Sequence, residues 1–124
     1  MTVQTHRCKD TIMNREILFR GKRVDTGEWV EGFYWCIKDT HFIRGLKKLH
    51  IFDCEVHPST VGQYTGFKNK NGTKIFEGNR VDDEWTVVWS SVNCGWDCVH
   101  DDGVSECSLL DCLDGIITGN IHDK

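Results

Sequence analysis

The sequence is poor in the features that mark membrane, secreted and low-complexity proteins. It has one proline, Pro58, and no apolar run that approaches the ~18 residues a membrane-spanning helix requires. Its start, MTVQTHRCKD, lacks the apolar stretch of a secretion signal. Charged residues make up 27% of the chain and apolar residues 39%, which excludes a disordered polar tract. We therefore expect a folded cytoplasmic protein with no membrane partner.

Catalytic signatures are missing as well. The chain contains no phosphate-binding P-loop, no dinucleotide-binding fingerprint and no metalloprotease motif. The sequence therefore predicts no catalytic residue and no cofactor, and we expect a protein that is not an enzyme.

Charge is distributed unevenly along the 124 residues. Residues 1–74 contain thirteen Lys and Arg against eight Asp and Glu, whereas residues 75–124 contain two against eleven. Opposite surfaces of this kind can bring two copies of a chain together, because complementary potentials orient association. The alternative is that the fold mixes the two parts in space, so that their opposite charges cancel.

The pattern of residue types predicts a mainly β fold. Residues 16–24 and 28–37 are rich in β-branched and aromatic residues, and Gly27 between them suits a hairpin turn because it tolerates positive φ. In the second strand one face carries Trp29, Phe33, Trp35 and Ile37, and the other face carries Val30, Tyr34 and Cys36. Both faces would then be covered, which favours a central strand or a subunit contact.

A second hairpin has the clearest local signal. Residues 61–67 and 74–81 flank Asn71-Gly72, a pair suited to a tight reversal. Further strands are predicted at residues 49–56, 85–91 and 115–121, with a loop or ragged hairpin at 93–103 and a helical turn within 106–113. Short strands separated by turns indicate a small barrel or sandwich-like domain of antiparallel strands with one or two short helical turns.

Three blocks of sequence carry a family resemblance: residues 15–30, the run VGQYTGFKNKNGTKIFEGNRV at 61–81, and TGNI at 118–121. On these blocks the chain resembles the YopX family of phage and prophage proteins. The resemblance implies a phage or prophage origin, a β-rich fold and homo-oligomers, and assigns no activity. Members usually carry Asp where Asn79 stands, and their chains tend to begin near Met13. Residues 1–14 are therefore predicted to form an N-terminal extension or arm, and residues 15–124 a single domain.

The seven cysteines allow two interpretations. Cys94, Cys98, Cys107 and Cys112 supply four thiols, with His100 as a substitute, and tetrahedral zinc requires four such donors. Their spacings are looser than the usual zinc knuckle, so free and mostly buried thiols are favoured, and no metal site is predicted.

Two acidic segments also carry alternatives. Cys98, His100, Asp101 and Asp102 together offer a nucleophile, a base and a carboxylate, but an exposed acidic loop is the favoured interpretation because real triads assemble from distant segments. The carboxylate oxygens of residues 82–84 could hold a hard cation. The favoured interpretation is that these residues form a turn and keep the surface soluble.

Five tryptophans near Lys and Arg are compatible with base stacking, so a nucleic-acid-binding small barrel is an alternative function. The pI of about 5.8 argues against it. A basic rim around the second hairpin instead suggests a ligand site for a small anion, since glycine exposes backbone amides beside lysines. Its candidate residues are Gln63, Tyr64, Thr65, Gly66, Lys68, Lys70 and Lys74.

The sequence thus predicts a phage-encoded accessory protein that acts as a non-enzymatic, homo-oligomeric binding module. Its partners would be copies of itself and a host protein or a small anionic ligand. Nucleic-acid binding is the alternative, and a metal- or thiol-dependent enzyme is the less favoured one.

Overall fold

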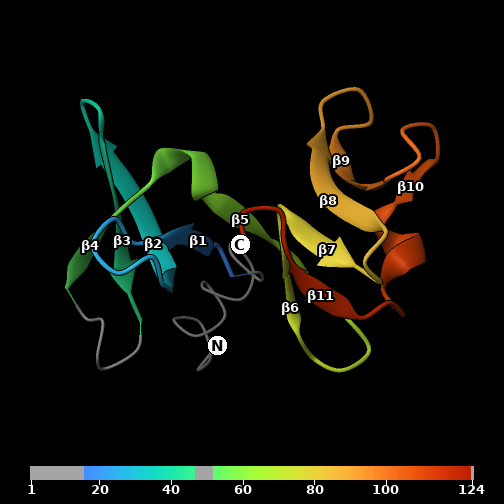
Figure 1. Cartoon of the computed structure of the whole chain (residues 1–124), viewed down its shortest axis with the longest axis horizontal. Coiled ribbons are helices and arrows are strands. Elements are labelled where there is room, and N and C mark those ends of the chain that lie inside the picture. Colours follow the sequence, from blue (N-terminus) through green and yellow to red (C-terminus); the bar gives the residue numbers. More distant parts are fainter. Residues whose placement is uncertain (1–15, 47–51, 124) are drawn as a thin grey trace, which may run out of the picture.

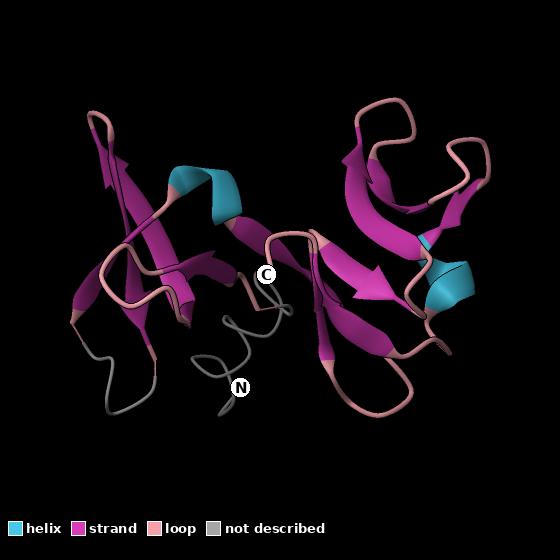
Figure 2. Cartoon of the chain, in the orientation of Figure 1, coloured by secondary structure: helices cyan, strands magenta, loops and turns pink. Residues whose placement is uncertain are grey.

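Residues 16–46 and 52–123 are described by the computed structural model, and within them the chain forms eleven β-strands in two antiparallel sheets (Figures 1 and 2). The first sheet has the order β4-β3-β2-β1-β5-β6. Its strands are β1 (Phe19–Lys22), β2 (Trp29–Ile37), β3 (Thr40–Gly45), β4 (Asp53–Val56), β5 (Gly62–Lys68) and β6 (Lys74–Phe76). A single 3₁₀ turn, η2 (Pro58–Thr60), precedes β5.

The second sheet has the order β10-β9-β8-β7-β11. Its strands are β7 (Asn79–Val81), β8 (Trp85–Ser90), β9 (Gly95–His100), β10 (Glu106–Ser108) and β11 (Ile117–Asn120), and a 3₁₀ turn, η3 (Leu109–Cys112), follows β10. Figure 1 shows β1–β4 at one end of the molecule and β7–β11 at the other, with β5 and β6 between them.

The predicted fold class, mainly β with short antiparallel strands and short helical turns, is confirmed. Both sheets are open, and neither closes into a barrel in the described part of the chain. No helix there is long and apolar enough to cross a membrane. The predicted division at residue 15 stays a prediction, because residues 1–15 lie outside the described ranges. Lys47, Lys48 and the first three residues of the strand predicted at 49–56 also lie outside them.

The first predicted hairpin is confirmed. Phe19 pairs with Gly32 and Lys22 with Trp29, and Gly27 in the turn has φ +75°. The strand β2 lies between β1 and β3, so it is central as predicted. Residues 40–45, which sequence reasoning assigned to no strand, form its other neighbour, β3.

The two faces of β2 differ in burial. Val30 packs in a buried cluster with Ile43 and Val56. On the opposite face, three large apolar side chains remain exposed by 57%, 42% and 58%: Phe33, Trp35 and Ile37. The described chain covers this outer-face row only in part, where Trp35 stacks on Phe42 with ring centroids 4.5 Å apart.

The second hairpin reverses at Asn71-Gly72 as predicted, and Gly72 has φ +81°. The buried Asn69 organises the loop, because its Oδ1 accepts hydrogen bonds from the backbone amides of Asn71 and Thr73 at 3.0 and 2.9 Å. The strand predicted at 74–81 is in fact two strands in different sheets. The chain bends at Gly78, which has φ +90° and donates its backbone N–H to the carbonyl of Val87 at 2.8 Å.

The two sheets differ in charge. The boundary between β6 and β7 lies close to the point where the sequence turns from basic to acidic, and residues 79–123 contain ten acidic residues and one basic residue, Arg80. The second sheet is therefore acidic, whereas the described residues of the first sheet, 16–46 and 52–76, contain eight Lys and Arg against seven Asp and Glu and are nearly neutral.

Each part of the molecule has its own small core. Five buried residues form the core of the second sheet: Ile75, Val81, Val87, Cys98 and Leu109. A third cluster of Leu18, Tyr64 and Phe76 lies on β5 and β6 and the residue before β1, between the other two.

Candidate functional site

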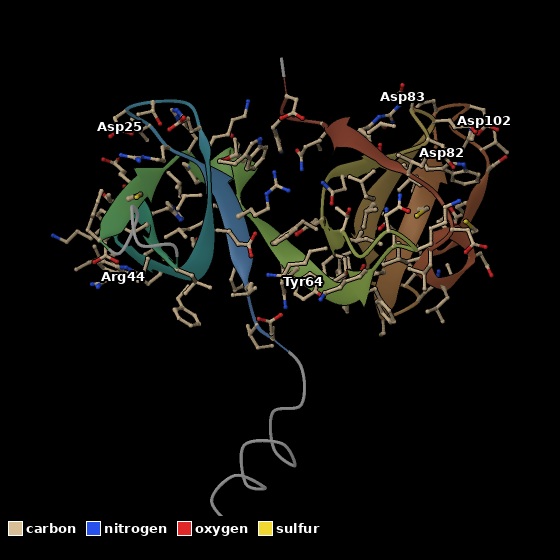
Figure 3. The ribbon with its side chains drawn as sticks, turned by 90° about the horizontal axis from the view of Figure 1, so that it is seen from below. Asp25, Arg44, Tyr64, Asp82, Asp83 and Asp102 are labelled. Atoms are coloured by element: carbon tan, nitrogen blue, oxygen red, sulfur yellow. The ribbon has the colours of Figure 1, made fainter. Side chains whose placement is uncertain are left out.

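The candidate ligand residues at the second hairpin divide into buried and exposed groups. Tyr64 is 5% exposed and packs its ring 5.4 Å from that of Phe76 (Figure 3). Thr65 is also buried, and its hydroxyl donates to the carbonyl of Ile75 at 2.8 Å. Gln63 is half-buried, whereas Gly66 is exposed with φ +90°.

The lysines of this hairpin do not converge. Lys74 donates to Glu31 at 2.8 Å, and that hydrogen bond raises the pKa of the ammonium group. Lys68 and Lys70 remain as exposed side chains near the tip. Anion binding at this tip stays a prediction, and the structure offers it two lysines rather than three.

A large pocket lies elsewhere, where the end of β5 meets the β8–β9 turn and β10. It is open to solvent and has a volume of about 600 Å³. It is lined by Thr65, Phe67, Trp89, Asn93, Cys94, Gly95, Trp96, Asp97, Glu106, Cys107, Ser108, Leu109 and Leu110. We call it the aromatic pocket, after Phe67, Trp89 and Trp96.

The two tryptophans of the aromatic pocket are placed by strand pairing. Trp89 on β8 lies directly opposite Trp96 on β9, and their rings meet edge to face with centroids 5.1 Å apart. Trp89 nevertheless stays 51% exposed, so its indole is available to a ligand. Aromatic rings of this kind can receive apolar groups on their surface or cations over their faces.

The charge of the aromatic pocket has one sign. Asp97 and Glu106 belong to its lining, and no Lys, Arg or His is found among the described residues that line it. Asp97 is 9% exposed, and its Oδ2 accepts a hydrogen bond from Asn93 at 2.9 Å. The pocket is therefore suited to a cationic group better than to an anion.

Sequence reasoning missed the aromatic pocket. Residues 93–103 were expected to be a loop or ragged hairpin, but 95–100 form β9, which pairs with β8 from Ser90↔Gly95 to Trp85↔His100. Trp89 and Trp96 lie at equal distances from the turn between β8 and β9, and this spacing indicates that they pair across the two strands. Because residues 93–103 were interpreted as a loop or ragged hairpin, the pairing was not predicted.

Three of the four proposed thiol ligands come together. Cys98 is fully buried, and Cys107 and Cys112 pack against it with their Sγ atoms 3.3 Å apart. Burial raises the pKa of these thiols to about 11, 12 and 11 respectively, so all three are protonated at neutral pH. Cys94 lies apart in an exposed turn, and no group of three or more His, Cys, Asp or Glu in the described ranges is arranged to hold a metal.

The ring of His100 is held from both sides. Its Nε2 lies 3.1 Å from a Glu84 carboxylate oxygen, which raises the pKa of the imidazole, and its Nδ1 accepts the backbone N–H of Asp102 at 2.9 Å. The ring also packs edge to face on Trp85 at 4.8 Å. Both ring nitrogens are thus used by the fold, and neither is directed at the buried thiol of Cys98.

The acidic run after β7 forms a turn, as favoured from sequence. Asp82 and Asp83 both have positive φ, at 54° and 59°, and the Asp82 carboxylate accepts the backbone N–H of Ile116 at 2.9 Å. Figure 3 shows Asp82, Asp83 and Asp102 gathered at the outer end of the second sheet, and Asp25 and Arg44 at the opposite end of the molecule.

A comparison with protein families gives one finding. The family model described as YopX protein matches residues 18–124, which is nearly the whole chain. Neither a curated protein nor a solved structure matches the chain.

Proposed function

This chain belongs to the YopX family, and on that basis we propose that it is a phage- or prophage-encoded accessory protein that works in the host cytoplasm as a non-enzymatic, homo-oligomeric binding module. Family membership suggests the phage-type accessory role. The binding role rests on the aromatic pocket, and self-association rests on the surfaces of the two sheets.

The non-enzymatic part is supported by what the reactive groups do. The thiols of Cys98, Cys107 and Cys112 lie in or against the core with raised pKa values, and a protonated thiol is a poor nucleophile. The imidazole of His100 is engaged through both nitrogens. These groups therefore serve packing and loop structure.

One observation carries the binding role: the aromatic pocket combines Phe67, Trp89 and Trp96 with two acidic residues and with no basic residue among its described lining. Cations bind over aromatic faces and beside carboxylates, with energies of about 2 kcal/mol where water is excluded. We therefore assign the pocket to a Lys or Arg side chain of a host protein. A small anionic ligand would require a different part of the surface.

Self-association is supported by two features together. The outer-face row of Phe33, Trp35 and Ile37 is exposed on the first sheet, and the second sheet is acidic. A contact between the first sheet of one copy and the second sheet of another would cover apolar surface and bring Lys and Arg side chains to the acidic sheet. Such a head-to-tail contact closes into a ring when its rotation allows.

The pocket assignment is tested by calorimetric titration with short peptides that differ at one position, Arg, Gln or Glu. The Arg peptide should bind best, and Trp89→Ala should weaken it by about tenfold or more, because the cation loses an aromatic face. Phe52→Ala, which removes an exposed aromatic outside the pocket, is the matched control and should have no effect. Equal binding of the Glu peptide, or unchanged binding to the Trp89→Ala variant, would contradict the assignment.

A further inference from the structure

The guanidinium of Arg20 on β1 lies over two aromatic rings, that of Trp29 on β2 and that of Phe76 on β6. Its central carbon is 4.4 Å from the ring centroid of Trp29 and 5.1 Å from that of Phe76. Rings over a guanidinium cover its faces and leave the N–H groups at its edge, which is the geometry in which arginine receives planar or tetrahedral oxyanions.

Arg20 makes no hydrogen bond and no ion pair with any residue in the described ranges. The other three arginines there each pair with a carboxylate, through Arg23–Asp25, Arg44–Asp53 and Arg80–Asp101 at 2.8, 3.0 and 2.7 Å. Burial lowers the pKa of the Arg20 guanidinium, and the nearby charges of Glu31 and Asp123 act against that effect without cancelling it. The guanidinium is half-buried, and no buried side-chain nitrogen in the described ranges lacks a hydrogen-bond partner, so the N–H groups of Arg20 reach solvent and are open to an acceptor from outside the chain.

The two carboxylates near Arg20 are already engaged. Glu31 accepts the ammonium group of Lys74 at 2.8 Å. Asp123 accepts the indole N–H of Trp29 at 2.9 Å and the backbone N–H of Asn120 at 2.9 Å. Neither carboxylate reaches the guanidinium within hydrogen-bonding distance.

A second cation stands on the same face of β1. Lys22 is two residues from Arg20, its Nζ lies 5.6 Å from the ring centroid of Trp29, and it donates one hydrogen bond, at 2.6 Å, to the carbonyl of His122. An ammonium group has three donors. Lys74 is a third cation nearby, and the charges of Glu31 and Glu16 act on it.

We propose that Arg20, supported by Lys22, anchors a binding site for a small oxyanion of the phosphate or carboxylate class. The oxyanion would accept two parallel N–H groups from the guanidinium edge. The site shares no residue with the aromatic pocket, so each can fail without the other. It also places the anion expected from sequence on β1 rather than at the tip of the second hairpin.

The test is calorimetric titration with sodium phosphate and, separately, sodium acetate at constant ionic strength set with chloride. Wild type should bind at least one of them, and Arg20→Lys and Arg20→Met should each weaken it by about tenfold or more, because a charge-assisted pair of hydrogen bonds is lost. Arg23→Met is the matched control and should bind as wild type does, since Arg23 already pairs with Asp25.

Melting without ligand shows that each variant is folded. Arg20→Met should melt slightly below wild type, because the guanidinium contacts with the rings of Trp29 and Phe76 are lost. Absence of binding by both anions, equal weakening by Arg23→Met, or wild-type binding by Arg20→Lys would each overturn the proposal.

Discussion

The side-chain oxygen of Asn79 accepts the backbone N–H of Phe76 at 2.7 Å, across the bend at which the chain passes from the first sheet to the second. Its amide nitrogen donates to the carbonyl of Gly119 at 3.3 Å, so one buried side chain joins β6, β7 and β11. The second bond requires an amide nitrogen, which Asn supplies.

Asn79→Ala should therefore lower the free energy of unfolding by about 1 to 3 kcal/mol, because the Phe76 amide loses its acceptor. Urea denaturation measures the loss. Asn71→Ala, on the exposed turn, is the matched control and should change stability little. Equal stability of the two variants would show that the Asn79 contacts do not join the sheets as described.

The loop after β9 should respond to acid. Backbone N–H groups of Val104 and Ser105, with the Ser105 hydroxyl, hold the pKa of Asp102 at about 2, below its ordinary value of 3.8. A carboxyl group with a depressed pKa in the folded state stabilises it above pH 3.8 and loses that contribution as the pH falls through about 2.

The stability difference between wild type and Asp102→Asn should then shrink as the pH falls from 3.8 to about 2. Thermal unfolding of both proteins across this range measures it. A difference that does not change with pH would mean that the carboxylate does not hold the loop.

Thiol reactivity should follow burial. In native protein at pH 8, the exposed Cys36 and Cys94 should react with an alkylating reagent, whereas Cys98 should be protected. Burial raises the pKa of Cys98 from 9.0 to about 11, which alone lowers its thiolate fraction on the order of a hundredfold. Peptide mapping after timed labelling reports each site, and urea should remove the protection. Labelling of Cys98 as fast as Cys94 in native protein would contradict its placement in the core.

The turn at Gly72 should tolerate no branched residue. The site has open space around it, so the cost of Gly72→Val comes from its φ of +81°. We expect a loss of about 1 kcal/mol or more in unfolding free energy. Gly95→Val, at a glycine with no positive φ and its nearest neighbour 3.8 Å away, is the control and should cost less in the same denaturation experiment.

Local signals in the sequence predicted the hairpins well, because Gly27 and Gly72 each mark a turn whose geometry depends on few residues. The break at Gly78 was missed, since residues 74–81 form one continuous strand pattern and only tertiary contacts, through Asn79 and Val87, divide them between sheets. The aromatic pocket and the Arg20 site depend on pairing between distant segments. Composition and spacing along the chain carry no direct signal for either.

Self-association is the part of the account most open to direct measurement. Sedimentation velocity at increasing concentration should show a closed oligomer at ~100 μM, because specific interfaces of standard size bind more tightly than this. High salt should promote dissociation of the oligomer, because it screens the attraction between opposite charges. Trp35→Ser, in the exposed row on β2, should weaken assembly, whereas Val92→Ser, at an equally apolar but isolated exposed position, should not. A wild-type protein that remains monomeric at ~100 μM in low salt would contradict the homo-oligomeric binding module.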